Sequence, residues 1–352
     1  MNDTQDKPVS LKKLLSKETA IERLTALWAI HEAGLGGFVH LFDTPFTGIV
    51  MGSMSSVCIM FIAYFSDKNV NTLLKTVILV LIAKVVVSPH TSISAYVAVI
   101  CQGVFGAYLF RYLPSFKLGV ILLTVFALLE SSIQRIVMLT LVHGNSIWKA
   151  TDVFLAQVLE KFGVQISSGS IWLIGTYITI HILAGIVIGF VATGLLKSVV
   201  DIIKNDKQNE QINDTFIALN SDIKDKIKPQ NTAIKHFLVF FSSGAIFLIF
   251  TMMLPEQKGL KYALYALIRT ITFLVLWGVV IQPIALRLFN KYLSTKQQKY
   301  SQEVESMFSY MGTLHKLVGI AWKDSKQYRG LRRIHNFTTR SLAYTLLYQP
   351  DF

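Results

Sequence analysis

The sequence predicts an all-α, polytopic membrane protein. Of its 352 residues, 52% are hydrophobic and only 16% are charged, and the mean hydropathy is +0.49, far above that of an ordinary soluble domain. Apolar stretches long enough to cross a hydrocarbon core of about 30 Å recur along the chain. We therefore expect a membrane helix bundle of about eight transmembrane helices, six before a polar linker and two after it.

The first six helices are expected within residues 20–198, after a cytoplasmic N-terminus of residues 1–19. The hydrophobicity of the first stretch is lowered by His31, Glu32 and Gly34, and the third stretch is among the shortest. Their predicted ranges are 24–40, 46–66, 72–88, 93–112, 117–142 and 171–196.

A polar cytoplasmic linker, residues 199–235, divides the chain into two parts. Residues 236–286 follow as a two-helix membrane segment, with predicted helices at 236–254 and 262–286. The remaining residues, 287–352, are predicted to be a basic cytoplasmic tail.

The distribution of basic residues predicts the orientation, because Lys and Arg accumulate on the cytoplasmic side of short loops. With the N-terminus inside, 27 of the 34 Lys and Arg residues are cytoplasmic and four are outside. The remaining three, Lys84, Arg135 and Arg269, lie within the membrane. Both termini are therefore predicted to be cytoplasmic, in the inner (plasma) membrane of a bacterium. The net charge of +13 fits an anionic lipid leaflet, so we expect the lipid bilayer rather than nucleic acid as partner.

The chain lacks the sequence patterns of common cofactors and enzymes. Cys58 and Cys101 both lie in apolar stretches, which indicates neither a disulfide framework nor a zinc site. The sequence contains no Walker A, HExxH or Gly-x-Ser-x-Gly motif. We expect no cofactor, no metal and no enzymatic activity. An intramembrane enzyme that transfers protons through Glu130, His181 and Glu32 remains an alternative.

Ionisable residues inside membrane helices are costly and usually either functional or paired with one another. Those of this chain fall in the outer half of their predicted helices, which indicates a small-molecule site open to the outside. Lys84 and Arg135 favour an anionic ligand, although Lys84 could also extend to the membrane surface and His181 could be a hydrogen-bonded packing residue. The candidate substrate-binding residues are Glu32, Lys84, His90, Glu130, Gln134, Arg135 and His181.

Residues 20–198 resemble the substrate-binding S components of energy-coupling factor (ECF) transporters. The resemblance lies in six helices within about 180 residues, an internal N-terminus and a long outer loop before the sixth helix. In that family, small residues on the first helix pack against the coupling (T) component, and Ala29, Ala33 and Gly37 have the matching spacing. The resemblance implies a small-molecule substrate together with ATPase and transmembrane coupling subunits as partners.

The tail departs from that family, whose S components end after six helices. Tyr328, Arg329 and Gly330 resemble the Ala-Arg-Gly motif that T components present to their ATPases. The apolar positions Met307, Leu314, Leu317 and Trp322 suggest amphipathic helices that dock a partner, and a basic helix on anionic lipid is the alternative. The expected docking residues of the tail are Arg329, Gly330, Arg332 and Arg333.

The combined features predict a multipass transport protein, the substrate-binding component of an ECF-like importer for a small nutrient. The principal alternative is a non-transporting membrane scaffold or assembly factor, in which the membrane charges only pair with one another.

Overall fold

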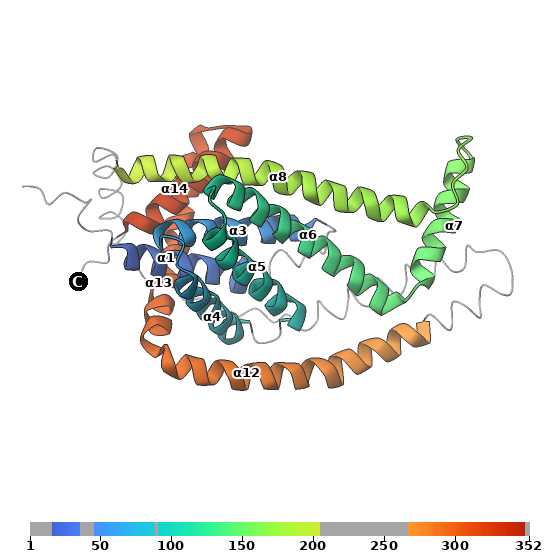
Figure 1. Cartoon of the computed structure of the whole chain (residues 1–352), viewed down its shortest axis with the longest axis horizontal. Helices are drawn as coiled ribbons and strands as arrows, with labels where there is room; N and C mark the ends of the chain where they lie inside the picture. The colour runs from blue at the N-terminus through green and yellow to red at the C-terminus, as the bar shows by residue number, and fades with distance from the viewer. Residues whose placement is uncertain (1–15, 36–45, 89–90, 205–266, 349–352) are drawn as a thin grey trace, which may run out of the picture. The chain divides into compact units, whose positions relative to one another are not determined.

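A computed structural model describes residues 16–35, 46–88, 91–204 and 267–348, and these contain helices and no strand (Figure 1). Six helices among them are long and apolar enough to cross a membrane. They are α3 (Thr47–Phe65), α4 (Val70–Val87), α5 (Ile93–Tyr112), α6 (Phe116–His143), α8 (Gly169–Lys204) and the helix Leu267–Lys299, which includes the π-helical turn η4 (Leu276–Ile281) and α12 (Gln282–Lys299).

These six helices confirm the predicted all-α membrane bundle. Of the two remaining predicted spans, residues 236–254 lie outside the described part of the chain. The span at 24–40 corresponds in part to α1 (Lys17–Ile30) and the π-helical turn η2 (His31–Leu35). α1 begins earlier than predicted because Ser16 caps it: its side chain accepts a hydrogen bond from the Thr19 N–H at 3.0 Å.

The described residues fall into two compact units whose boundaries differ from the predicted domains. The first contains the chain up to Gln134, the residues from Thr176 to the end of α8, and those from Ala285 onward. The second contains Arg135–Gly175 and the described residues before Ala285. The tail therefore belongs to the same unit as the first membrane helices.

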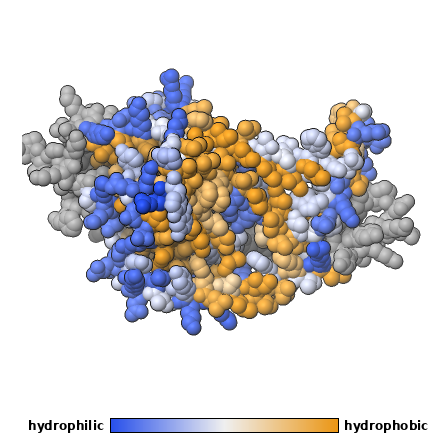
Figure 2. Space-filling model, viewed as in Figure 1, coloured by the Kyte–Doolittle hydropathy of each residue, from blue (hydrophilic) through white to orange (hydrophobic). Residues whose placement is uncertain are grey.

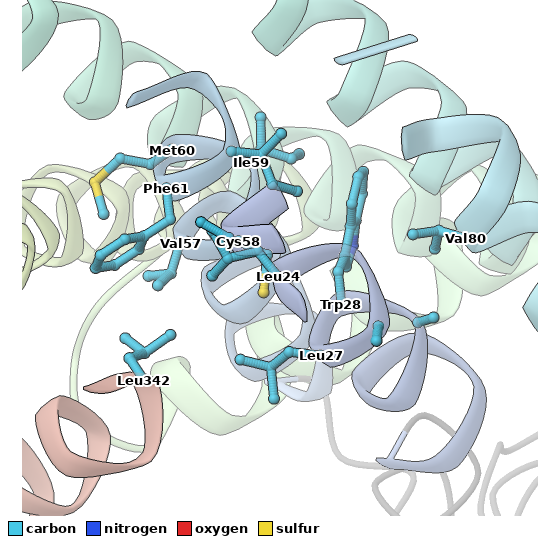
Figure 3. Close-up of a cluster of buried hydrophobic side chains, with 14 of the residues drawn as sticks. Leu24, Leu27, Trp28, Val57, Cys58, Ile59, Met60, Phe61, Val80 and Leu342 are labelled. Atoms are coloured by element: carbon cyan, nitrogen blue, oxygen red, sulfur yellow. The ribbon is translucent and has the colours of Figure 1, made fainter. Parts of the chain in front are cut away.

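In the first unit, α1 is buried at the centre and packs against α3 and α4. Figure 3 shows Leu24, Leu27 and Trp28 of α1 among the labelled side chains Val57, Cys58, Ile59, Met60 and Phe61 of α3, Val80 of α4 and Leu342 of the tail. Because burial of apolar area is the main favourable term in folding, α1 holds the unit together.

Two tail helices complete this core. α13 (Ser301–Asp324) and α14 (Gly330–Leu347) are joined by the short 3-10 helix η5 (Ser325–Gln327), and both pack against α1. Met307, Leu314 and Leu317, which were expected to face a partner, are buried inside the chain. The tail is helical as predicted, but three of the four positions of its apolar stripe are buried within the protein, and the fourth, Trp322, is exposed.

Polar contacts hold the tail helices in place. The Arg23 Nη1 of α1 donates a hydrogen bond of 2.7 Å to the Leu346 carbonyl, one of the last carbonyls of α14 that lack a helical partner. The Lys75 ammonium of α4 donates to Glu303 of α13 at 2.7 Å, and this hydrogen bond lowers the pKa of Glu303. The two contacts tie the ends of the α13–α14 pair to α1 and α4.

Glycines bring α6 and α8 into close contact within the first unit. A Cβ on Gly185 would lie 2.7 Å from the Cα of Val125, and one on Gly189 would lie 2.7 Å from the Cα of Ile121. The Thr124 hydroxyl also donates to the Gly185 carbonyl at 2.8 Å. Small residues permit such backbone approach between membrane helices.

The second unit contains α7 (Ser146–Glu160), a helix within the long loop expected before the sixth span. Asp152 accepts a hydrogen bond of 2.7 Å from the Ser170 N–H at the start of α8, and this hydrogen bond lowers the pKa of Asp152. Trp148 donates from its indole nitrogen to Thr140 at 3.0 Å. These bonds fasten α7 to the helices on either side of it.

Candidate functional site

A buried ion pair joins η2 and α4 of the first unit. The Lys84 ammonium of α4 donates a hydrogen bond of 2.6 Å to Glu32 Oε2 of η2. Only 4% and 7% of the two side chains are exposed. The second oxygen of Glu32 accepts a hydrogen bond of 2.5 Å from the Ser55 hydroxyl of α3. Both carboxylate oxygens are therefore satisfied, each by a different helix.

The position of Glu32 depends on a local change in helix geometry. At His31, α1 passes into the π-helical turn η2. Such turns are rare in proteins, and those that occur are often found at functional sites. The Ser88 hydroxyl, just after α4, donates to the Ala33 carbonyl of η2 at 2.7 Å, and a ring nitrogen of His31 lies 3.1 Å from the Met51 carbonyl of α3. Neighbouring helices thus hold the turn on both sides.

α5 completes the surroundings of Lys84. The Lys84 ammonium is 3.4 Å from the Ala95 carbonyl and 5.9 Å from the centroid of the Tyr96 ring. A positive charge above an aromatic face is stabilised by the negative face of the ring. The ammonium is therefore surrounded by a carboxylate, a carbonyl and a ring, and its side chain is buried inside the bundle.

Glu130 lies in a second polar group between α5 and α6. The Gln102 amide of α5 donates to Glu130 at 3.2 Å, and the Gln134 amide donates to the Ser94 carbonyl at 2.9 Å. Glu130 and Gln134 thus both bind α5, in accord with their spacing of four residues. The ion pair of Lys84 is with Glu32 rather than Glu130.

His181 is fully buried and packs between aromatic rings. Its Nδ1 is 2.9 Å from the Tyr177 carbonyl, one turn earlier in α8, and its ring stacks on Phe46 with centroids 6.2 Å apart. This geometry fits the alternative of a hydrogen-bonded packing residue. Of the other predicted site residues, Arg135 belongs to the second unit and His90 lies outside the described residues.

The predicted docking residues have different environments. Ala29 and Ala33 are buried against the chain's own helices, so the expected packing face for a T component is already occupied. Gly37 lies outside the described residues. In the tail, the positions Arg329, Gly330 and Arg332 are exposed, whereas Arg333 is half-buried.

Three important residues were not predicted from the sequence: Ser55, Gln102 and Arg23. Gln102 is the one amide side chain of α5, and Ser55 stands beside Ser53 and Ser56 in α3, so a search for polar side chains in the spans would have found both. Arg23 precedes the predicted first span and gave no signal of its contact with Leu346.

Comparison with known proteins adds no family: no family model, no characterised protein and no solved structure matches this chain. Within the described residues, no cluster of three or more His, Cys, Asp or Glu side chains could hold a metal ion. The site is therefore interpreted from its own geometry.

Proposed function

We propose that this chain is a multipass membrane transport protein of the bacterial inner membrane, with the Glu32–Lys84 pair as the polar centre of its substrate path. The observation that carries the proposal is a Glu–Lys pair, 2.6 Å apart and almost fully buried, held by helices of a membrane bundle. Charges at such depth are expensive to bury and usually mark substrate or ion pathways.

The pair offers a chemical means of binding. A ligand with an anionic group competes with Glu32 for Lys84, and a ligand with a cationic group competes with Lys84 for Glu32. Either exchange gives the binding residue a new salt bridge, and it leaves the displaced partner without its counter-ion, so that partner must become protonated or hydrated. Glu32 is carried by a π-helical turn, an element that is frequently found at functional sites.

In its finer form, the proposal is that the chain is the substrate-binding component of an ECF-like importer for a small nutrient. The support is the layout of the first six predicted helices. Because Ala29 and Ala33 are buried, the T component would have to contact another surface. ATPase and coupling subunits should then co-purify with the chain after mild detergent extraction.

A membrane scaffold or assembly factor is the second candidate, and a specific observation favours it: Lys84 and Glu32 satisfy each other. In a scaffold the pair would only fix the packing of η2 and α4. Buried ion pairs of that kind can often be replaced together by uncharged residues without loss of stability.

One experiment separates the two candidates. The double variant Glu32→Gln with Lys84→Met removes both charges, and the partly exposed pair Lys75 and Glu303 provides a matched control, Lys75→Met with Glu303→Gln. Each protein is purified from native membranes, and its small molecules and protein partners are identified by mass spectrometry. Transport predicts a small molecule that is retained by the wild type and the control but lost from the first variant. If the wild type carries no small molecule and its protein partners are unchanged in both variants, the scaffold is supported.

A further inference from the structure

The turn between α13 and α14 carries a dense and unbalanced set of charges. We call residues 322–335 the α13–α14 tip. It contains five cations, Lys323, Lys326, Arg329, Arg332 and Arg333. Its one acidic residue, Asp324, accepts a hydrogen bond of 2.7 Å from the Tyr344 hydroxyl and lies 3.8 Å from Arg340. The acid is thus engaged by α14 rather than by the cations of the tip.

Large apolar side chains are exposed on the same tip. Leu331 is 84% exposed, Ile334 59% and Trp322 46%. The guanidinium carbon of Arg333 is 4.2 Å from the centroid of the Trp322 ring. By contrast, the apolar residues at the other end of α14 are buried, including Leu342 and Leu346. Within α13 and α14, the exposed large apolar side chains are therefore concentrated at the tip, among its cations.

The start of α14 adds further positive character. Arg329 is its N-cap, but the Arg329 side chain makes no capping hydrogen bond, and the first turn contains no acidic residue. The first N–H groups of a helix lack helical partners, and the dipole of the helix makes this end positive. Phosphate oxygens complement such an end.

The α13–α14 pair is anchored at the ends away from its tip, and one of the two anchoring helices is a candidate membrane span. α13 is bound to α4 through Lys75 and Glu303, and α14 is bound to α1 through Arg23. α4 is one of the candidate spans, and the tip belongs to the same compact unit. In Figure 2 the hydrophilic residues of the first unit gather at one end and the hydrophobic residues cover the region beside it.

We propose that the α13–α14 tip binds anionic lipid headgroups of the bilayer that the chain crosses, through its five cations and through insertion of Trp322, Leu331 and Ile334. Segments with basic residues beside Trp and Leu are typical of the membrane interface. Clustered Lys and Arg near a membrane are attracted to anionic leaflets.

Lipid fits the tip better than an acidic protein does. The cations are spread over α13, η5 and the start of α14, so they do not form one flat face. A layer of headgroups accepts cations at any angle, whereas a protein surface needs matched carboxylates in fixed positions. The bilayer is also present in the same molecule's surroundings, because the tip belongs to the compact unit that contains most of the candidate spans.

The test uses the full chain in lipid nanodiscs, with a fluorophore on a cysteine introduced at Gln327 and with Cys101 replaced by Ala. Lipids that carry a quencher at headgroup depth report contact of the tip with the bilayer. We expect strong quenching with 30% phosphatidylglycerol and weak quenching in pure phosphatidylcholine. Each cation near an anionic surface favours binding by roughly fivefold, so Arg329→Gln, Arg332→Gln and Arg333→Gln together should lower the ratio of bound to free tip by roughly a hundredfold.

Two further variants decide between lipid and protein. Replacement of the same three arginines by Lys should preserve quenching, since lipid attraction depends on charge and bidentate contacts with a protein do not survive this change. Replacement of Lys291, Lys296 and Lys299 of α12 by Gln removes the same net charge elsewhere and should also preserve quenching. The proposal fails if quenching is absent, is equal in both lipids, or is unchanged in the Arg→Gln variant. It also fails if quenching is lost on exchange to Lys, which would point to a protein partner instead.

Discussion

At the scale of single residues, this protein places charges where they must find partners inside the chain. Lys84 finds Glu32, Glu32 also binds Ser55, and Arg23 binds the Leu346 carbonyl. A charge buried without a partner costs several kcal/mol, which is why each of these residues has at least one close polar contact.

The Glu32–Lys84 pair should behave as a unit in stability measurements. Lys84→Met leaves a buried carboxylate and Glu32→Gln leaves a buried ammonium, so each single variant should lose about 3–5 kcal/mol of unfolding free energy. The double variant should lie within about 1 kcal/mol of the wild type, because no charge is left unpaired. Thermal unfolding in detergent checks both values. Additive losses in the double variant would show that the two residues do not interact.

Arg23 provides a second residue-scale prediction. Arg23→Met removes the hydrogen bond to the Leu346 carbonyl and leaves that buried oxygen without its donor, which should cost about 1–3 kcal/mol. The exposed Arg332→Met serves as control and should change stability by less than about 0.5 kcal/mol. Proteolysis of the C-terminal end should also become faster in Arg23→Met alone. Equal proteolysis of both variants would argue against the role of Arg23 as a cap.

At the scale of helices, close packing depends on residues with no side chain. Gly185 faces the backbone of α6, and a backbone atom cannot move aside as a flexible side chain can. Gly194, in the same helix, has no neighbouring atom within 4 Å of a Cβ added there. The two glycines therefore form a matched pair.

We expect Gly185→Ala to lower stability by about 1–3 kcal/mol, because its methyl group would push α6 and α8 apart. Gly194→Ala should be neutral or should stabilise the protein by up to about 1 kcal/mol, since Ala favours helix over Gly. Thermal unfolding of the two variants is the measurement. Similar losses in both would show that α6 and α8 are not in backbone contact at Gly185.

The contact between α7 and α8 should depend on pH. The hydrogen bond from the Ser170 N–H lowers the pKa of Asp152. Folding is therefore more favourable when the Asp152 carboxyl is ionised than when it is protonated. The stabilisation is present above the ordinary pKa of an aspartate and is lost as the pH falls through the lowered value. Relative to Asp152→Asn, the wild type should have a higher melting temperature at pH 7, and the difference should vanish in acid. A difference that is constant with pH would contradict this role.

At the scale of the whole molecule, the basic residues predict the orientation of the chain. A cysteine at Ser168 should react with a membrane-impermeant reagent from outside, and a cysteine at Asn213 should react only after the membrane is permeabilised. Labelling of both in intact cells is measured side by side. Reaction of the cysteine at position 213 in intact cells would contradict the predicted orientation and the expected cytoplasmic position of the tail.

The sequence by itself determined the class of the molecule and the position of most of its spans. A transmembrane helix needs about 20 consecutive apolar residues, and this is a local property that can be read along the chain. The helices at 47–65, 70–87, 93–112 and 116–143 accordingly match their predicted ranges within a few residues. The predicted shared face of Glu130 and Gln134 depends only on helical periodicity, and it too agrees with their contacts to α5.

Only the tertiary structure decided which residues meet. Glu32 and Lys84 are 52 residues apart, and Arg23 and Leu346 are 323 apart. Within a membrane, lipid and other helices are similarly apolar, so hydropathy does not say which faces pack together. For the same reason the apolar stripe of the tail could not be assigned to α1 rather than to a partner. Helix packing alone made Ala29 and Ala33 internal, paired Lys84 with Glu32, and left Leu331 and Ile334 at the surface.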